Sequence, residues 1–410
     1  MWSHSSRNAS SEDNLKVAFL VGSFFLPNAY VHISSAQLWR RAGVPWESMR
    51  FAHYFHRYEH RFLYAIVLIT ILWNDCFSLI TYTLSWDVPT AASGSVRLLI
   101  VSDPQLIGYR DEKWWLGPIS RWDSDRYLKR SFDWVMRVVK PDLVIFLGDL
   151  MDEGVQMGES EWDDTIVRFN DVFLMPEATQ VIYLPGDNDV GGEYEPVNAE
   201  LLKRFRDYFP NNVNPLSLGL EQVAFTELNI MSGVVTNITT TSGSLRIVLS
   251  HVPVTRAWSA KTQNTVYDLN PDLILSAHDH VPEVYSRRQR GDPNYERIGA
   301  KQLLSDSNPV RFRASSYDAR KELQFPTCSY RMGVKHMGYG VVKLTVAGDG
   351  RSMTVESSFL WLPSRFNQLY MYIIVLFVVL SRAFYIRCCC RRYQKRPVIL
   401  PFRSFKYATK

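Results

Sequence analysis

Five short apolar segments of the chain each end just before a residue that can bind a metal ion. The segments are residues 98–101, 143–147, 181–184, 247–249 and 273–275, and the residues that follow them are Asp103, Asp149, Asp187, His251 and His278. Apolar runs of this length are typical of strands buried on both faces. The carboxyl ends of such strands meet at one edge of an α/β sheet, where binding sites are built. The pattern therefore predicts an α/β domain with a metal site at that edge.

The chemistry of these five side chains points to a pair of divalent ions. Carboxylate oxygens mixed with imidazole nitrogens suit ions such as Mn, Fe or Zn. One aspartate at the point of convergence can bridge two ions about 3.5–4 Å apart, which is the arrangement used for in-line displacement at phosphorus. A single histidine at a strand end is more often structural than a ligand. Five ligand-type residues at successive strand ends instead favour a dinuclear phosphoesterase centre.

The blocks that hold these residues also follow a recurring order. The chain has DPQ at 103–105, GDLMD at 148–152, GDND at 186–189, His251, and HDH at 278–280. In this order they resemble the calcineurin-like metallophosphoesterase superfamily, whose pattern is DxH, GDxxD, GNHD/E, H and GHxH. The stretches SDPQLIG, FLGDLMDEG, YLPGDNDVGGEYE, EWDDTIVRFN and RWDSDRYLKR more closely resemble the eukaryotic membrane-bound enzymes that remodel glycosylphosphatidylinositol (GPI) anchors.

This resemblance covers roughly residues 96–285 and two flanking apolar segments. It implies a two-sheet β-sandwich flanked by helices, placed between two transmembrane helices. It also implies a phosphodiesterase that removes ethanolamine phosphate from a mannose of the GPI glycan and so promotes export of GPI-anchored proteins from the endoplasmic reticulum (ER). The expected cofactors are two divalent ions, with manganese the expected metal. The expected partners are GPI-anchored proteins as substrate and cargo receptors of ER exit.

The resemblance also implies roles for individual residues. The first metal would be held by Asp103, Gln105, Asp149 and His280, and the second by Asp149, Asp187, His251 and His278, so that Asp149 bridges. Asp152 would support a ligand from behind. The catalytic group would comprise Asp149, Asn188 and His280.

Three departures from the superfamily pattern bear on activity. Gln105 replaces a histidine and is a weaker donor, Asp187 replaces an asparagine and is a stronger one, and Asn188 replaces the histidine that assists the leaving group. An amide cannot act as a general acid, so help for the leaving group would come from a metal ion, from a solvent proton or from a residue such as His280 or Arg121. Two alternatives stay open: a metal-binding lumenal receptor for GPI glycans, and a metallophosphatase with another lumenal substrate.

Two apolar segments, 62–84 and 367–386, flank the predicted domain. Each reaches the ~20 residues that span a bilayer, and the alternative is a pair of buried core helices. Five arginines lie between positions 40 and 61, and the tail from Arg387 holds eight Lys/Arg and no acid. The positive-inside rule then places residues 1–61 and 387–410 in the cytosol and 86–366 in the lumen. Because the tail outweighs the net charge of +5, the remainder is acidic and is not expected to bind nucleic acid.

The address expected from these features is the ER, its exit sites or the Golgi, since short spans suit thin early-secretory membranes. Asn237-Ile-Thr239 is a glycosylation sequon in the predicted lumenal part. Cys388, Cys389 and Cys390 are either a palmitoylation site or unmodified thiols. The charge-free segment 17–33 is interpreted as an interfacial or poorly structured element, and the alternatives are a signal-peptide core or a third membrane segment.

Within the domain, helical periodicity appears at 128–139, 162–173 and 199–208, and strands are expected at 340–346 and 353–362. An insertion before the first helix holds Trp114, Trp115, Arg121, Trp122 and Arg126. It is interpreted either as a sugar- and phosphate-binding loop or as aromatics that pack on the domain or on the membrane surface. Residues 286–335 are expected to form a long irregular excursion, a lid or a partner surface.

Overall fold

The structure is a computed structural model, which describes residues 61–394 except 178, 212, 240–244, 258, 289–293, 306–308 and 316. The chain divides into two compact units, Met1–Ile69 and Thr70–Lys410. Segment 17–33, nearly all of the predicted cytosolic region 1–61 and most of the tail after 387 lie outside the described residues. The predictions for them therefore stay predictions.

Two mixed β-sheets form the centre of the unit Thr70–Lys410. The first has the order β10 (Val310–Ala314), β13 (Met353–Trp361), β12 (Gly338–Val346), β1 (Ser95–Val101), β2 (Leu143–Phe146) and β3 (Gln180–Tyr183). The second has the order β5 (Val234–Asn237), β4 (Val223–Asn229), β6 (Leu245–Leu249), β7 (Leu273–Ser276), β11 (Arg320–Gln324), β8 (Glu283–Arg287) and β9 (Glu296–Ile298). Strands β1, β2 and β3 are parallel, as are β4, β6, β7 and β11.

Alternating side chains of the strands enter different cores. On β1, Leu98 and Ile100 enter a core shared by both sheets, whereas Leu99 and Val101 enter the core beneath the helices. On β6, Ile247 and Leu249 join the shared core, and Val248 faces the opposite side with Val266 of a helix. Because successive side chains of a strand point to opposite faces, the apolar runs noted in the sequence are buried on both faces.

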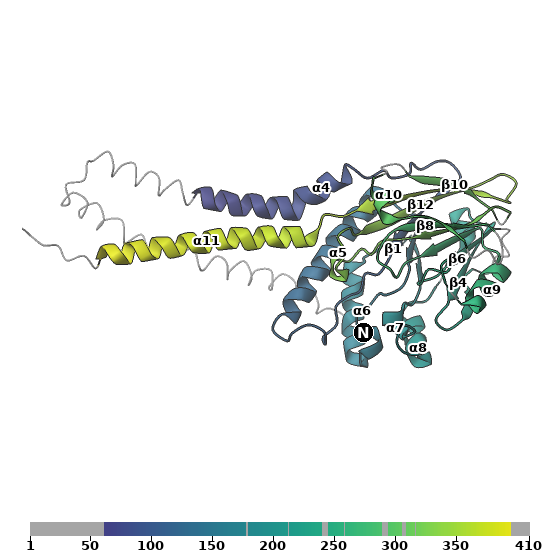
Figure 1. The fold of residues 1–410 in the computed structure, drawn as a ribbon, viewed down its shortest axis with the longest axis horizontal. Coiled ribbons are helices and arrows are strands. Elements are labelled where there is room, and N and C mark those ends of the chain that lie inside the picture. The colour runs from purple at the N-terminus through teal and green to yellow at the C-terminus, as the bar shows by residue number, and fades with distance from the viewer. Residues whose placement is uncertain are drawn as a thin grey trace, which may run out of the picture. The chain divides into compact units, whose positions relative to one another are not determined.

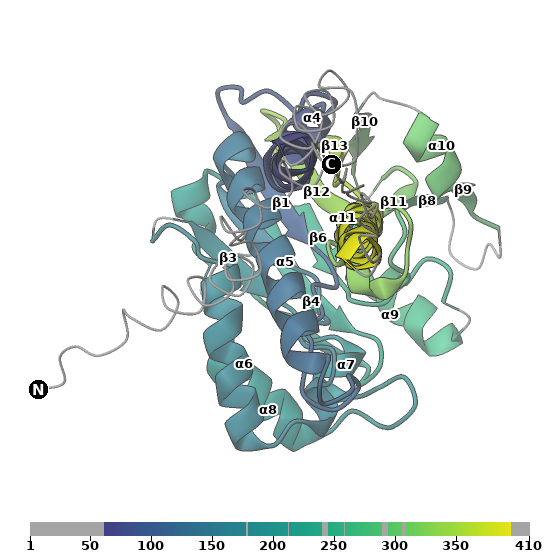
Figure 2. The same ribbon diagram turned by 90° about the vertical axis from the view of Figure 1, so that its left-hand side faces the viewer.

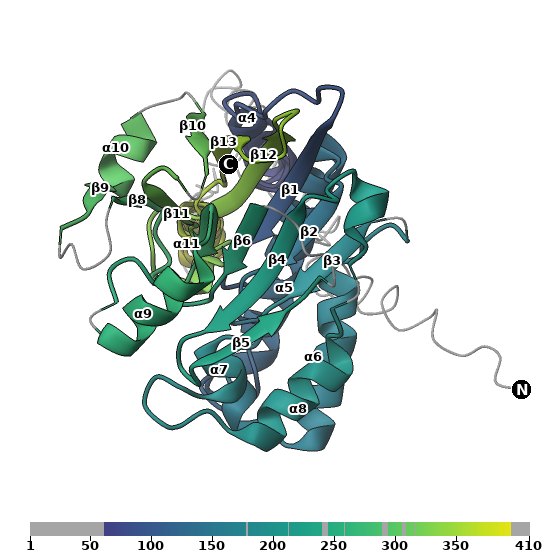
Figure 3. The same cartoon turned by 90° about the vertical axis from the view of Figure 1, so that its right-hand side faces the viewer.

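Helices cover the outer faces of both sheets, as Figure 3 shows. Those that pack on the first sheet are α5 (Gly117–Val139), α6 (Glu159–Val172) and α8 (Ala199–Tyr208), and α9 (Ala260–Leu269) packs on the second. On α5 the predicted stripe of Leu128, Phe132, Val135 and Val139 is fully buried, and the helix ends at Lys140 in the left-handed conformation. The predicted α/β fold, a two-sheet sandwich flanked by helices, is confirmed.

Shorter elements complete the described chain. They are η1 (Trp73–Phe77), α4 (Ser78–Thr83), η2 (Gly154–Gln156), α7 (Asp187–Val190), η3 (Pro215–Leu218), α10 (Ala300–Ser305) and η4 (Tyr330–Met332). The described chain ends with the long helix α11 (Arg365–Gln394), which Figure 1 shows.

The prediction of an irregular excursion at 286–335 was wrong. This stretch supplies β9, β10 and β11, and β11 lies inside the second sheet between β7 and β8. Strand β11 was not predicted because its sequence is polar. Its polar groups are buried with hydrogen-bond partners elsewhere in the fold. The Glu322 carboxylate accepts hydrogen bonds from the amides of Val254 and Thr255, at 3.0 and 2.7 Å. Buried polar groups with partners are compatible with a central strand.

Two helices, Arg61–Thr83 and Arg365–Tyr385, are long and apolar enough to cross a membrane. They agree with the predicted segments 62–84 and 367–386. Side chains such as Ile373, Ile374 and Phe377 are more than 60% exposed, which disfavours the alternative of buried core helices. That these helices span a bilayer stays a prediction.

Candidate metal centre

Four predicted ligands meet where strands of both sheets end. Ligand atoms of Asp149, Asp187, His251 and His278 all lie within 4.8 Å of one another. Asp187 Oδ1 lies 2.9 Å from His251 Nε2 and 3.0 Å from His278 Nδ1, and the two nitrogens are 3.2 Å apart. Two ligands of one ion at about 2.1 Å are separated by about 3.0–3.4 Å at octahedral or tetrahedral angles. The spacing therefore fits a shared cation at the predicted second metal position.

The residues predicted for the first metal lie beside this cluster. Gln105 Nε2 is 2.9 Å from Asp149 Oδ2 and 3.4 Å from His280 Nε2. Asp103 is fully buried, and neither of its carboxylate oxygens has a hydrogen-bond partner among the described residues. A buried carboxylate without a partner is costly, and a cation would relieve that cost. The donor set therefore fits a second ion held by Asp103, Gln105, Asp149 and His280.

The Asp149 carboxylate lies between the two predicted metal positions and accepts hydrogen bonds on both of its oxygens. Its Oδ2 accepts hydrogen bonds from the Gln105 and Asn188 side-chain amides, both at 2.9 Å, and its Oδ1 accepts one from the Asn188 backbone amide at 3.0 Å. These bonds fix the carboxylate between the two predicted metal positions, where a bridging ligand must lie. They also place Asn188 directly at the centre.

His251 is oriented for ligation by its second nitrogen. Nδ1 lies 2.7 Å from the Leu147 carbonyl oxygen, which can only accept, so Nδ1 carries the hydrogen and Nε2 faces the cluster. Burial lowers the pKa of His251, but the carboxylates of Asp149, Asp187 and Asp103 outweigh it and raise that pKa to about 10. The protein field at Nε2 thus strongly favours a positive charge, and a divalent ion would compete there with a proton.

The same field acts on the carboxylates. Burial raises the pKa of Asp149 well above its usual range, with the neighbouring carboxylates adding to the rise. For Asp187, burial raises the pKa but hydrogen bonds from His251 and His278 outweigh it, so the pKa is lowered. Perturbed groups of this kind cluster at functional sites.

The backbone is strained at the same residues. Among the described residues, seven besides glycine have a positive φ, and five of them are predicted ligands: Asp103 (47°), Gln105 (43°), Asp149 (53°), His278 (71°) and His280 (64°). Side chains other than glycine rarely adopt this conformation. Such strain persists where the surroundings hold the chain in a functional geometry. The positive φ angles direct the side chains of these five residues toward the candidate metal centre.

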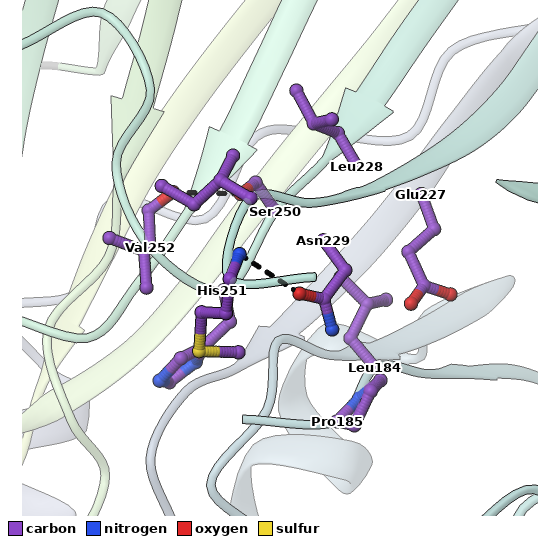
Figure 4. Close-up of a pocket in the computed structure, with 10 residues that line it drawn as sticks. Leu184, Pro185, Glu227, Leu228, Asn229, Ser250, His251 and Val252 are labelled. Carbon is purple, nitrogen blue, oxygen red and sulfur yellow. Dashed lines mark hydrogen bonds between the residues drawn. The ribbon is translucent and has the colours of Figure 1, made fainter. Parts of the chain in front are cut away.

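A small pocket adjoins the back of His251, as Figure 4 shows. It is lined by residues 184–185 after β3, by residues 227–231 at the end of β4 and just beyond it, and by residues 250–252 after β6. Of the predicted ligands only His251 belongs to this lining, so the pocket lies behind the centre and is separate from the carboxylate cluster.

Comparison with known proteins agrees with this geometry. Residues 96–282 match the model of the family described as calcineurin-like phosphoesterase, and they contain every predicted ligand. Together with the Asp/His cluster, this match supports a metal-dependent phosphoesterase. The chain is similar to Metallophosphoesterase 1 of Ailuropoda melanoleuca, with 30% identity over 36% of this chain and 38% of that protein. It is also similar to Cell division control protein 1 of Saccharomyces cerevisiae, with 23% identity over 70% of this chain and 65% of that protein.

A 5'-nucleotidase precursor from Thermus thermophilus is a similar solved structure, with 12% identity and a TM-score of 0.32 over 70% of this chain and 59% of that chain. The Drosophila melanogaster Metallophosphoesterase 1 homolog is 28% identical over 33% of this chain and 35% of that protein. The chain thus spans little more than a third of the Metallophosphoesterase 1 proteins named here.

The metallophosphoesterase centre depends on one residue that the sequence analysis missed. Asp189 is fully buried, and its carboxylate accepts hydrogen bonds from the amides of Gly186, Leu150 and Met151 at 2.9–3.1 Å. It thereby joins the loop after β2 to the loop after β3. The second aspartate of GDND is the signal that could have revealed it.

Asp152, by contrast, was expected to support a ligand, and its carboxylate instead lies within 4.8 Å of those of Asp111 and Glu153. Burial and the negative charges of Glu153 and Asp111 raise its pKa to about 6. The supporting role that was predicted for Asp152 is better matched by Asp189.

Asp189→Ala should lower the free energy of unfolding by about 2–4 kcal/mol, since three buried amides lose their acceptor. Thermal unfolding of the purified full chain measures this. Glu177→Ala is the matched control, because Glu177 is exposed and surface changes usually cost less than about 0.5 kcal/mol. Equal unfolding midpoints for the two variants would refute the role given to Asp189.

Proposed function

We propose that this chain is a metal-dependent phosphodiesterase of the early secretory pathway, which removes ethanolamine phosphate from a mannose of the GPI glycan. The observation that carries the chemistry is the cluster of Asp149, Asp187, His251 and His278 beside the buried Asp103 carboxylate, which accepts no hydrogen bond from the described residues. The substrate is supported by the resemblance to GPI-remodelling enzymes and by similarity to the Metallophosphoesterase 1 proteins.

The roles of the residues follow from their contacts. Divalent ions held here, manganese being the expected metal, would polarise the phosphoryl oxygens and lower the pKa of an attacking water. Asp149 is held between the two positions by the amides of Gln105 and Asn188. His251 is fixed by the Leu147 carbonyl so that Nε2 faces the centre. Each ligand is thus oriented before the phosphodiester arrives, which lowers the entropy cost of the reaction.

Departure of the leaving group needs a proton donor. The Asn188 amide donates to Asp149 at 2.9 Å and can offer a hydrogen bond but no proton. Arg121 donates to the Gly108 carbonyl at 3.0 Å and lies over the Tyr109 ring, so its guanidinium holds the loop after Gln105. His278 and His280 are both partly exposed at the centre, and we assign the proton transfer to His280.

The proposed location follows from the two apolar helices and their basic flanks. Helices Arg61–Thr83 and Arg365–Tyr385 would span an ER or Golgi membrane with the phosphoesterase domain in the lumen. There the domain would meet GPI-anchored proteins as substrate and cargo receptors of ER exit as partners.

A lumenal domain should carry a glycan on Asn237. This residue is exposed on β5, an edge strand of the second sheet, where a transferase can reach it. We expect an endoglycosidase-sensitive shift in gel mobility that Asn237→Gln removes. A second sequon, Asn8-Ala-Ser10, lies in the predicted cytosolic region 1–61 and should stay unmodified. Protease cleavage of the domain in intact microsomes would overturn the proposed topology.

The substrate is tested by mass spectrometry of GPI glycans from cells that lack this protein. The proposal expects glycans that retain an extra ethanolamine phosphate, and restoration of the wild-type pattern by the intact chain but not by Asp149→Ala. Unchanged glycans would remove the GPI substrate. The receptor alternative rests on Gln105, Asn188 and Ala277, and hydrolysis of a generic aryl phosphodiester with Mn would exclude it.

A further inference from the structure

The N-terminal end of α5 exposes an unusual amount of apolar surface. Trp114, Trp115, Ile119 and Trp122, here called the α5 tip, are 88%, 56%, 59% and 51% exposed. Large apolar side chains that gather on a surface mark a contact with a protein or a membrane. The tip also lies close to the metal centre along the chain, since it begins nine residues after Gln105.

Helix α5 is fixed to the described part of the first apolar helix. Arg126 and Arg130 form ion pairs with Asp75 at 2.9 and 3.1 Å, and Trp134 Nε1 donates to Thr83 Oγ1 at 2.7 Å. Eight residues separate the contacts on both helices, so α5 and segment 75–83 run side by side in the same direction. The ion pairs explain why the first apolar segment contains the charged residue Asp75.

Helix α5 is also fixed to the start of α11. Tyr127 donates to the Pro363 carbonyl oxygen at 3.0 Å, and Arg365 forms a buried ion pair with Asp123. Gln368 Nε2 then donates to the Asn74 carbonyl oxygen at 3.1 Å. Polar contacts therefore join the two apolar helices to the domain at the start of α11, and most side chains from 369 to 380 are apolar and exposed.

The α5 tip continues the face that touches the first apolar helix. Ile119, Trp122, Arg126 and Arg130 are spaced three or four residues apart, so they share one side of α5. Arg126 and Arg130 occupy that side at Asp75, and Trp122 and Ile119 follow one and two turns further on. Figure 2, which looks along α11, shows α5 crossing the face of the domain at which α11 begins.

We propose that the α5 tip inserts into the interfacial layer of the same bilayer that the two apolar helices span. Tryptophan has an apolar ring with one polar N–H, and it gathers at the boundary between headgroups and acyl chains. This inference rests on the proposed membrane location. Of the two interpretations of the insertion, this inference favours packing on the membrane surface. The inserted tip would hold the loop after Gln105 next to substrates anchored in that bilayer.

The test uses the full chain in lipid-only nanodiscs of phosphatidylcholine. An environment-sensitive fluorophore is attached to one cysteine at a time, introduced by Trp114→Cys, Trp115→Cys, Tyr317→Cys or Leu376→Cys. The native cysteines are first replaced by serine, except for buried Cys328, which is kept. Tyr317 is the matched aqueous control, since it is 86% exposed and lies between β10 and β11, whereas Leu376 reports the middle of the second apolar helix.

Aqueous iodide should quench the probes at 114 and 115 about fivefold less than the probe at 317, as expected for side chains at the acyl boundary. Quenching at 376 would show that the proposed membrane location itself fails. A shielded 376 with 114 and 115 quenched like 317 would overturn only the tip proposal. Shielding that appears in microsomes but not in lipid-only discs would assign the tip to a protein partner and would also overturn it.

Discussion

Asp149→Ala should abolish metal-dependent hydrolysis, by at least about 10³-fold, because the change removes the ligand that both ions would share. The carboxylate is 2% exposed and accepts three hydrogen bonds from Gln105 and Asn188. Alanine leaves those donors without their acceptor, at a cost of about 1–3 kcal/mol each. Part of the loss of activity is therefore loss of the geometry of the centre.

The measurement is the metal-stimulated hydrolysis of an aryl phosphodiester by the purified chain. Asp207→Ala on α8 is the matched control, because Asp207 is exposed and far along the chain from the ligands. It should keep the wild-type rate. Activity of Asp149→Ala within a few fold of wild type would rule out a dinuclear centre built on Asp149.

Gly186→Ala should cost at least about 10²-fold in activity, although it adds only one methyl group. The backbone of Gly186 approaches Asp149 so closely that a Cβ would lie 2.1 Å from Asp149 Oδ1 and 2.3 Å from the Asp149 backbone nitrogen. The loop after β3 and the bridging carboxylate must therefore move apart. A displacement of about 1 Å in a catalytic group is enough for a loss of this size.

Gly158→Ala is the matched control, since a Cβ at Gly158 meets no atom within 4 Å. Both variants are compared by activity and by the Mn concentration that gives half-maximal rate. We expect Gly186→Ala, but not Gly158→Ala, to need a higher Mn concentration for half-maximal rate. Equal rates and equal Mn requirements for the two variants would contradict the close approach at Asp149.

The sequence predicted that several candidate ligands lie together because each of them follows a regular strand. Parallel strands buried on both faces have a clear apolar signature, and their carboxyl ends must converge, so Asp149, Asp187 and His251 could be placed together before any coordinates. The stripe on α5 was predicted for a similar reason. Local periodicity and a shared sheet edge carry this information without knowledge of long-range contacts.

Hydrogen bonds and ion pairs between residues far apart in the sequence could not be predicted in this way. Segment 320–324 was taken as irregular because its charged residues are satisfied by distant groups, as Glu322 is by the amides of Val254 and Thr255. The local sequence does not explain Asp75 within an apolar helix either, because its partners Arg126 and Arg130 lie 51 and 55 residues away. Such pairings depend on the packing of whole elements, which no local pattern encodes.

The central claim is that two divalent ions bound at this centre drive phosphodiester hydrolysis. It is tested most directly by measuring, on the same purified wild-type chain, the number of Mn ions bound and the rate of aryl phosphodiester hydrolysis as Mn is added after chelation. We predict that two Mn ions bind per chain. Activity should be absent in chelator and should return as the second ion binds. Binding of no Mn, or a rate that is the same with and without chelator, would contradict it.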